Sequence, residues 1–463
     1  MRPLPLNAAR LSDLPAGIAR PAYDRAALRT GVVHLGPGAF FRAHQAPVFD
    51  ALAADGERRF GVLAAALVSP HRAAALQAQD GLYVLEVREG EARRRRAVGA
   101  VRGALAAAAA QDQLLAALAA PTTHLVTLTI TEAGYGAGPG TGGSAAAALL
   151  AEALALRRDR GLAPFTALSC DNLDDNGARL RSLVLAAARD RPDLADWIAW
   201  RGAFPSSMVD RIAPAADAED RACLAAETGV SDAALTLTEP FWRWVIEDRF
   251  AGARPDLERA GVTLTRDVRP FARAKLRLLN AAHSALAYLG LLQGDTFVHE
   301  AIARPGLAAL VERLWDEAAA TLAPPPELDL ARYRADLMRR FANAALAHRL
   351  DQVASDGSQK LPPRLIAPLA EREGRPSPAL ALAVAAWLKA AGAADRRFTD
   401  AKDEHLKAWA RDGGEAPERL ARAERDGLLP VLPPLGRRHV AEALARLDSA
   451  GPEAALAAAI GEG

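Results

Sequence analysis

The sequence changes character near Val268, and this change constrains the fold more than any other feature. Before it, short β-branched and apolar runs alternate with helix-like segments; after it the pattern is helical, with little strand signal. Alternating strands and helices predict an α/β domain in which helices cover both faces of a parallel sheet. Because 463 residues exceed one ordinary hydrophobic core, we expect two domains, residues 1–267 and 268–463.

Individual elements follow from the same patterns. The predicted strands are Gly31–Leu35, Phe60–Leu63, Tyr83–Val87, His124–Ile130 and Phe165–Ser169. The predicted helices are Ala104–Ala119, Ala272–Leu292, Pro305–Leu322, Leu328–Leu350, Ala379–Gly392 and His439–Leu447. The predicted loops are Gly134–Gly143 and Glu371–Pro378.

Charge and cysteine content exclude several classes of protein. The chain has 57 basic and 56 acidic residues, a formal net charge of +1, which gives no reason to expect nucleic acid or a membrane as partner. Its two cysteines, Cys170 and Cys223, provide neither a disulfide framework nor a CxxC metal site. No signal peptide or membrane span is recognisable, so we expect a soluble cytoplasmic protein.

A glycine motif, GPGAFFR, follows the first predicted strand and opens a helix. Glycines at this place let the backbone approach a pyrophosphate, and the helix N-terminus offers free N–H groups. Phe41 stands where the usual GxGxxG pattern has its third glycine, so a simple tight turn is the alternative. The motif predicts dinucleotide binding, with contacts from Gly36, Gly38, Ala39, Phe40 and Arg42.

The end of the second predicted strand lacks the acidic residue that would accept a hydrogen bond from the ribose 2′-hydroxyl. Ser69, Pro70, His71 and Arg72 stand there instead. Ser69 and Arg72 are expected near the cofactor, and His71 and Arg72 suit a 2′-phosphate. The alternative is that Arg72 is a solvated helix residue, so the choice between NAD and NADP stays open.

Lys275, Asn280 and His283 form the second motif. Lysine and asparagine each occur only five times in the chain, whereas arginine is abundant. Unlike arginine, a desolvated lysine can lose its proton. On an α-helix the three residues fall within an arc of about 140°, where a base and two polarising groups could serve hydride transfer from an alcohol. The alternative is a snorkelling lysine, a capping asparagine and a core histidine.

Three further segments carry polar residues at informative places. Asn172 ends a late strand, where open α/β sheets bind ligands, although an Asx turn or helix cap would also explain it. Asp210 and Arg211 share a loop-like segment, for which a surface salt bridge is the common alternative. Lys360 follows an Asp-Gly turn.

Together these segments resemble the long-chain polyol dehydrogenase/reductase family, which includes mannitol 2-dehydrogenases and fructuronate (mannonate) reductases. The matching stretches, in order from residue 34 to 364, are HLGPGAFFRAHQ, QDGLYVL, TLTITEAGYG, SCDNLDDNGARLR, FPSSMVDRIAP, EPFWRWVIEDRFAGARP, KLRLLNAAHSALAYLG and SDGSQKLPPR. The resemblance implies a Rossmann-type domain followed by a mostly α-helical domain of the 6-phosphogluconate-dehydrogenase type. It also implies metal-independent hydride transfer with NAD, with NADP not excluded, at a site between the domains.

The resemblance also implies roles for individual residues. Lys275 is then the general base, Asn280 and His283 polarise the substrate oxygen, and Asn172 completes the pocket for that oxygen. The remaining implied contacts are to the cofactor from Thr131 and Glu132, and to the substrate from Asp210, Arg211, Gln352, Lys360 and Arg364.

The substrate class depends on the segment before the SDGS turn. Mannitol dehydrogenases tend to carry arginine there, whereas this chain has Gln352, which is more like a fructuronate reductase. Lys360 or Arg364 could pair with a uronate carboxylate. Two departures from the family are Ala272, where an acidic residue is common, and Ser206, where asparagine is usual.

We therefore expect oxidation of D-mannonate to D-fructuronate by a monomeric enzyme. The alternative is a polyol dehydrogenase that converts D-mannitol and D-fructose. The alternative from a different class is a non-catalytic nucleotide-binding regulator. Such a protein is expected to have lost one or more of Lys275, Asn280 and His283, and all three are present.

Overall fold

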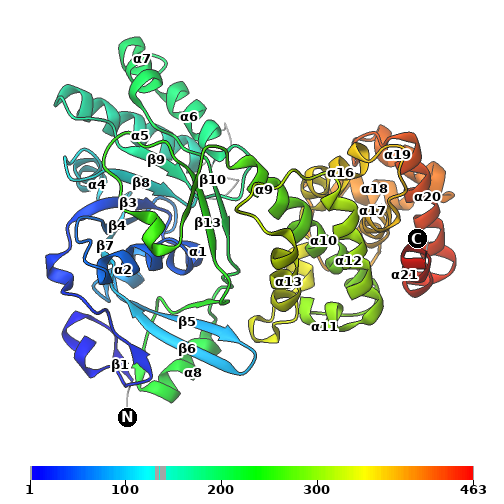
Figure 1. The fold of residues 1–463 in the computed structure, drawn as a ribbon, viewed down its shortest axis with the longest axis horizontal. Helices are drawn as coiled ribbons and strands as arrows, with labels where there is room; N and C mark the ends of the chain where they lie inside the picture. Colours follow the sequence, from blue (N-terminus) through cyan, green and yellow to red (C-terminus); the bar gives the residue numbers. More distant parts are fainter. Residues whose placement is uncertain (1–2, 131–134, 136–141, 462–463) are drawn as a thin grey trace. The chain divides into compact units, whose positions relative to one another are not determined.

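A computed structural model describes residues 3–130, 135 and 142–461. The expected contacts Thr131 and Glu132, and most of the expected loop Gly134–Gly143, lie outside the described residues. The chain forms two compact units, residues 1–269 and 270–463 (Figure 1).

The first unit is built around a five-stranded sheet in which every neighbouring pair is parallel, in the order β7-β4-β3-β8-β9. The strands are β3 (Thr30–Leu35), β4 (Gly61–Ala66), β7 (Val101–Ala106), β8 (Leu125–Leu128) and β9 (Thr166–Ser169). Chain order reverses between β3 and β8, which is the Rossmann arrangement and its ligand-binding switch point. The apolar residues of these strands belong to two buried hydrophobic clusters, one on each face of the sheet, as expected for strands covered on both sides.

Helices cover this sheet, and smaller sheets extend the unit (Figure 1). The helices are α1 (Ala39–Ala43), α2 (Ala46–Ala54), α3 (Pro70–Gln77), α4 (Gln111–Leu118), α5 (Gly142–Asp159), α6 (Asn176–Ala187), α7 (Pro192–Arg201) and α8 (Ala218–Thr228). The additional sheets have the orders β12-β5-β6-β2, β10-β13-β14 and β1-β11. Their strands are β1 (Leu4–Pro5), β2 (Ile18–Ala19), β5 (Tyr83–Glu89), β6 (Ala92–Val98), β10 (Ser207–Asp210), β11 (Val230–Ser231), β12 (Thr236–Thr238), β13 (Arg243–Glu247) and β14 (Thr263–Thr265).

Two predictions for this unit need correction. The run Tyr83–Val87 is a strand, but it pairs antiparallel with β6 in a separate sheet. The predicted helix Ala104–Ala119 is wrong at its start, since Ala104–Ala106 belong to β7 and the helix begins only at Gln111. Alanine favours helix, but β7 lies at the sheet edge beside β4 and packs against α3, and these tertiary contacts override local preference.

The second unit is helical, and its described residues contain no strand beyond one isolated bridge between Phe297 and Arg349. Its α-helices are α9 (Arg269–Lys275), which begins in the first unit, α10 (Ala281–Leu292), α11 (Val298–Ala303), α12 (Pro305–Ala319), α13 (Leu330–Phe341), α14 (Leu350–Ala354), α15 (Gly357–Leu361), α16 (Ala367–Glu371), α17 (Pro378–Ala391), α18 (Asp403–Arg411), α19 (Ala416–Arg425), α20 (Pro434–Ser449) and α21 (Gly451–Gly461). Helices α10 and α17 pack together and are buried along most of their length, which makes them the centre of the unit's core.

Two segments of this unit are π-helical. Residues Leu276–Asn280 form one π turn between α9 and α10, and Pro362–Ile366 form a second between α15 and α16. The predicted single helix Ala272–Leu292 is therefore continuous but not α-helical throughout. The predicted helix Leu328–Leu350 is wrong in its second half, because α13 ends at Phe341 and a short 3₁₀ turn, Ala344–Leu346, follows.

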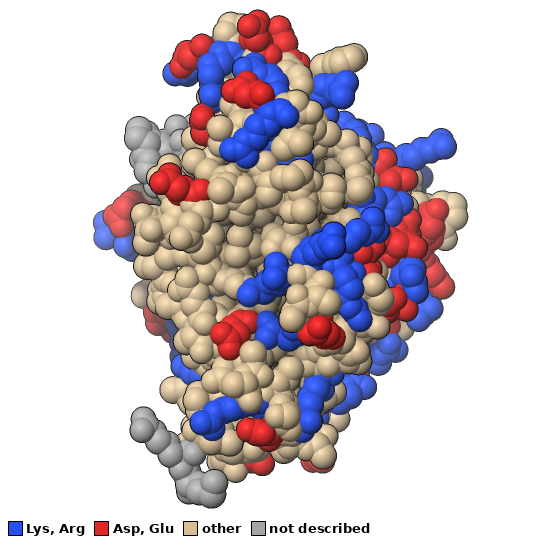
Figure 2. All heavy atoms as spheres, turned by 90° about the vertical axis from the view of Figure 1, so that its left-hand side faces the viewer, with Lys and Arg blue, Asp and Glu red and all other residues tan. Residues whose placement is uncertain are grey.

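No helix among the described residues is long and apolar enough to cross a membrane. One face of the molecule carries acidic and basic side chains next to one another around a broad uncharged area (Figure 2). This mixture fits the near-zero net charge.

Candidate active site

The glycine turn of the first unit lies at the switch point of the parallel sheet. Gly36 has φ +93°, and a Cβ there would lie 2.2 Å from the carbonyl oxygen of Thr129, the residue after β8. A side chain at Gly36 would therefore collide with the neighbouring strand's end. Gly38 precedes α1, and the first atom that its Cβ would meet is Arg72 Nη1 at 3.5 Å. The turn thus leaves an open cradle at a helix N-terminus, which fits a dinucleotide pyrophosphate.

Phe41 explains how the motif works without its third glycine. Its ring is fully buried and stacks on the His34 ring of β3, with ring centroids 3.7 Å apart. His34 in turn contacts Thr127 Oγ1 at 2.8 Å and Thr129 Oγ1 at 3.1 Å. Burial lowers the pKa of His34 to about 3, so its imidazole is neutral. A stacked aromatic pair therefore takes the place of the close helix–strand approach that glycine normally allows.

Arg42 supports the turn from within the unit. Its Nη1 donates to the Pro37 carbonyl oxygen at 2.8 Å, and its Nε donates to Thr236 Oγ1 at 2.9 Å. Burial lowers the pKa of this guanidinium. These hydrogen bonds stabilise the glycine turn. A direct contact of Arg42 with the cofactor stays a prediction.

The end of β4 carries the other predicted cofactor residues. Ser69 is the N-cap residue of α3, and Arg72 is exposed on the first turn of that helix. The distance from Arg72 Nη1 to the Cβ position of Gly38 places the guanidinium beside the glycine turn. Arg72 is exposed, and its contact with the cofactor stays a prediction.

Asn172 is exposed just after β9, and the cap of the following helix α6 is Asp175 rather than Asn172. The alternative explanation as a helix cap is therefore wrong. The neighbouring Asn176, which the motif analysis did not single out, is buried and joins two strand ends. Its Nδ2 donates to the carbonyl oxygens of Asp171 and Ser207, and its Oδ1 accepts from the Ser207 N–H, each at 2.9 Å. Rarity of asparagine was the only sequence signal for it.

Asp210 and Arg211 are placed at the end of β10. Asp210 is 2% exposed, so it is not a surface residue. The Arg211 guanidinium donates to the carbonyl oxygens of Ala43 at 2.6 Å and Glu239 at 2.9 Å. Burial lowers the pKa of Arg211 to about 10. These bonds join α1 and β12 to β10, and a substrate contact by Arg211 stays a prediction.

In the second unit the π turn sets the geometry of Lys275 and Asn280. A π turn pairs residues five apart, whereas an α turn pairs residues four apart. Lys275 and Asn280, which are five apart, therefore stand above one another on one side of the helix, closer than an arc of 140° would place them. His283 follows three residues later on α10, on the same side.

Asn280 and His283 have polar atoms available to a ligand. The two residues are 8% and 7% exposed. Among the described residues, Asn280 Nδ2 and His283 Nε2 have no hydrogen-bond partner. Buried polar groups are rarely left unpaired in a folded protein, so these two atoms indicate a ligand site.

His283 is held in a cationic environment. Its ring centroid lies 4.8 Å from that of Phe341 and 5.2 Å from that of His348, which meets it edge-on at 87°. Burial, and then the charges of His348, Arg340, Arg364 and Lys275, lower the pKa of His283 well below its usual value. The ring is neutral near pH 7, so one nitrogen can donate a hydrogen bond to an oxygen.

Lys360 is carried by a turn fastened to the core. Gly357 packs against Trp387 and Tyr288, and the Tyr288 hydroxyl donates to the Ala354 carbonyl oxygen at 2.9 Å. The Lys360 ammonium donates to the Ser355 carbonyl oxygen at 2.6 Å. These contacts fix the SDGSQK turn beside α10.

Arg364 and Gln352 differ in their placement. Arg364 lies in the second π turn, and its Nη1 donates to Ser284 Oγ at 3.2 Å, next to His283. Gln352 is exposed on α14, and its backbone N–H donates to Asp351 Oδ1 at 2.8 Å. The second unit therefore brings Arg364 to the Lys-Asn-His helix, whereas the Gln352 side chain faces solvent within this unit.

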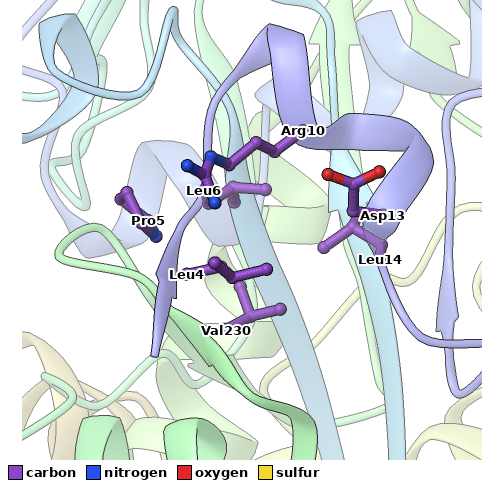
Figure 3. A pocket seen from close by; sticks show the side chains of 7 residues that line it. All are labelled: Leu4, Pro5, Leu6, Arg10, Asp13, Leu14 and Val230. Carbon is purple, nitrogen blue, oxygen red and sulfur yellow. The ribbon is translucent and has the colours of Figure 1, made fainter. Parts of the chain in front are cut away.

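Other features do not contribute to this site. In the part of the chain that the structure describes, no group of three or more His, Cys, Asp or Glu side chains could hold a metal ion. A small hollow near the N-terminus contains none of the predicted site residues (Figure 3). It is lined by Leu4, Pro5, Leu6, Arg10, Asp13, Leu14 and Val230.

Comparison with known proteins identifies the family of both parts of the chain. The sequence model of the mannitol dehydrogenase Rossmann domain matches residues 30–259, and that of the mannitol dehydrogenase C-terminal domain matches residues 267–422. A mannitol 2-dehydrogenase of Phaeosphaeria nodorum is 37% identical over 83% of this chain and 73% of its own length. A D-mannonate oxidoreductase of Escherichia coli is 38% identical over 85% of this chain and 84% of its own.

The fold is also found in a solved structure. Pseudomonas fluorescens mannitol 2-dehydrogenase, in a ternary complex with NAD and D-mannitol, matches with a TM-score of 0.85 and 33% identity. The match covers 99% of this chain and 100% of the other. Fold and sequence thus define an NAD-dependent dehydrogenase that acts on a CH–OH group. The chain belongs to the mannitol dehydrogenase family, and the resemblance and fold class expected from the sequence are confirmed.

Proposed function

We propose that this enzyme interconverts D-mannonate and D-fructuronate with NAD, and that Lys275 is its general base. The observation that carries the choice of substrate is the cationic environment around His283. Arg364 is hydrogen-bonded beside it, and the charges of Arg340, Arg364 and Lys275 all act on its ring. Cationic groups of this kind favour a substrate with a carboxylate.

The proposed chemistry uses the polar atoms of the second unit. Lys275 takes the proton from the substrate hydroxyl as oxidation proceeds. The Nδ2 of Asn280 and a ring N–H of neutral His283 donate to the substrate oxygen and stabilise the charge that develops on it. Bound NAD supplies the hydride acceptor. In the first unit, the turn at Gly36 and Gly38 is the proposed pyrophosphate cradle.

The assignment of the other residues rests on their family positions. Asn172 is proposed to complete the site for the substrate oxygen, and Asp210 to contact the substrate. Lys360 and Arg364 are proposed to bind the carboxylate, and Gln352 to replace the arginine of polyol-specific relatives. The polyol alternative, D-mannitol and D-fructose, is supported by relatives of that name at similar identity.

Initial rates with fructuronate and fructose, measured side by side with NADH, test the substrate. We expect a kcat/KM at least about tenfold higher for fructuronate, the effect of one charge-assisted hydrogen bond. Arg364→Gln should remove that preference by raising KM for fructuronate, with Arg375→Gln, an exposed arginine of the same unit, as the control. Equal or better activity on fructose would contradict the uronate assignment and leave the polyol alternative.

The remaining expectations stay predictions. They are the monomeric state, the cytoplasmic location and the division into domains at residues 267 and 268. If purified protein bound NADH but reduced no keto-sugar of a broad panel, the regulator alternative would replace the enzyme proposal. The unpartnered polar atoms of Asn280 and His283 argue for catalysis.

A further inference from the structure

The π turn that aligns Lys275 and Asn280 is held in place by a residue within it. Arg277 is the second residue of the turn, and its side chain points into the unit with 5% exposure. Its Nη1 donates to Glu371 Oε2 at 2.6 Å and to the Thr321 carbonyl oxygen at 3.0 Å, and its Nη2 also donates to Glu371. The guanidinium therefore makes a two-pronged contact with one carboxylate and a further contact with the end of another helix.

These partners come from elements on two sides of the turn. Glu371 is the last residue of α16, which directly follows the second π turn. Thr321 follows α12, and its Oγ1 accepts from Arg277 Nη1 at 2.5 Å and donates to the Ala318 carbonyl oxygen at 2.6 Å. The two π turns also pack against each other. Arg277 thus ties the turn that carries Lys275 to the segment that carries Arg364.

A second contact holds the backbone of the same turn. The indole Nε1 of Trp315 donates to the Leu278 carbonyl oxygen at 2.9 Å. Trp315 is fully buried on α12. A single π turn within an α-helix is uncommon, and it persists only where neighbouring groups stabilise it over the α-helical alternative. Neighbouring helices stabilise this turn through their contacts with the Arg277 side chain and the Leu278 carbonyl oxygen.

We propose that Arg277, clamped by Glu371, is a positioning residue that holds the π turn and so aligns Lys275 with Asn280 for the reaction. Arg277 points away from the substrate groups and acts through the backbone. The hydrogen bonds from Arg277 also lower the pKa of Glu371, which keeps the carboxylate charged at neutral pH. This inference rests on the proposed function, because it presupposes that Lys275 is the base.

Glu371→Gln tests the proposal with little risk to the fold, since the Glu371 side chain is 45% exposed. The variant removes the charge of the clamp but keeps the shape of the side chain. Because misplacement of a reacting group by about 1 Å can cost about 100-fold, we expect kcat to fall at least about tenfold. KM and the NADH dissociation constant should change less than about twofold, since no binding group is altered.

The primary deuterium kinetic isotope effect separates positioning from general structural damage. If the turn is misaligned, the chemical step becomes slower and the isotope effect on kcat rises. If the variant only loses folded protein, kcat falls in proportion to the titrated active sites and the isotope effect stays unchanged. Glu312→Gln is the matched control, because Glu312 pairs with Arg334 at 2.7 Å in the same unit and is 48% exposed.

The possible outcomes are distinct. A Glu371→Gln enzyme that behaves like Glu312→Gln in kcat and isotope effect overturns the clamp while Lys275→Ala still loses turnover. A Lys275→Ala enzyme that keeps wild-type kcat instead overturns the proposed function itself. Arg277→Lys should recover part of the kcat lost in Arg277→Met, because lysine can reach Glu371 but cannot fork to Thr321 as well.

Discussion

Gly357 packs directly against Trp387, so closely that a Cβ at Gly357 would lie 2.2 Å from Trp387 Nε1. The Tyr288 hydroxyl oxygen would lie 2.5 Å from that Cβ. Both neighbours are buried aromatic side chains of α17 and α10. The SDGSQK turn can therefore pack against the core only because residue 357 is a glycine, which has no side chain.

Gly357→Ala should consequently lower both stability and activity. Overpacking a buried position costs about 1–3 kcal/mol, and the strain is relieved only by moving the turn that carries Lys360. Thermal unfolding should show a lower Tm, and KM for fructuronate should rise. Gly306→Ala is the control, because its Cβ would have only Leu456 Cδ1 nearby, at an ordinary 3.9 Å. Equal Tm values for the two variants would contradict the close packing.

Lys275→Ala should lose most turnover while it keeps cofactor binding. Removal of a general base typically costs about 10²–10⁴-fold in rate, and the glycine turn that is proposed to bind NADH lies in the other unit. Fluorescence titration with NADH and steady-state rates across pH would measure the two properties. Lys407→Ala, at an exposed lysine paired with Glu404, is the control. A pH–rate profile like that of the wild type would refute the role of Lys275.

Cofactor preference can be tested at Ser69, the N-cap residue of α3 beside Arg72. No carboxylate stands there to repel a 2′-phosphate, so we expect NADPH to bind within about tenfold of NADH. Ser69→Asp should weaken NADPH binding by at least about tenfold and spare NADH, because like charges in contact are costly. Gln77→Asp, at the far end of the same helix, should change neither. Direct titration with NADH and NADPH measures both affinities. If the wild-type enzyme did not bind NADPH, the proposed contact of Arg72 with a 2′-phosphate would be contradicted.

The neutral state of His34 predicts a loss of stability in mild acid. Its folded pKa of about 3 lies below the unfolded value of 6.5, so between these values the unfolded chain binds a proton that the folded chain does not. The free energy of unfolding should therefore fall as pH drops below 6.5, by about 2 kcal/mol at pH 5. Urea denaturation from pH 7.5 to 5 would show a flatter dependence in His34→Gln than in the wild type.

His71→Gln controls that comparison, because His71 is exposed in the same unit. Its pH dependence should follow the wild type. If His34→Gln and His71→Gln gave the same slope as the wild type, buried His34 would not be the source of the acid sensitivity.

Local pattern was enough to predict the strands β3, β4, β8 and β9 and the glycine turn, because each is formed by contiguous residues. It was not enough for β5, whose run was recognised but whose partner, β6, is a matter of long-range pairing. Ala104–Ala106 were predicted helical because alanine favours helix, whereas their position at the sheet edge decides their structure.

In the candidate site, too, the sequence predicted the residues that stand out locally but not the features that depend on tertiary structure. The rare Lys275 and Asn280, followed by His283, stand out in the sequence, but the π turn between Lys275 and Asn280 does not, since Leu-Arg-Leu-Leu is an ordinary helix-forming run. Arg42 and Arg211 were predicted as ligand contacts, yet Arg42 bonds to the distant Thr236 hydroxyl, and Arg211 bonds to the distant carbonyl oxygens of Ala43 and Glu239. Such bonds depend on tertiary structure, which residue type and spacing do not reveal.

The π turn at Leu276–Asn280 also has a consequence for comparing related chains. Exchanging one leucine of this turn for another apolar residue leaves the directions of Lys275 and Asn280 unchanged. Deleting one residue converts the turn into an α turn, in which the lysine and the asparagine are four residues apart and still lie on one side of the helix. A homologue with a single-residue gap here can thus keep its base aligned with the asparagine, so a gap between these two residues is not by itself a sign of lost catalysis.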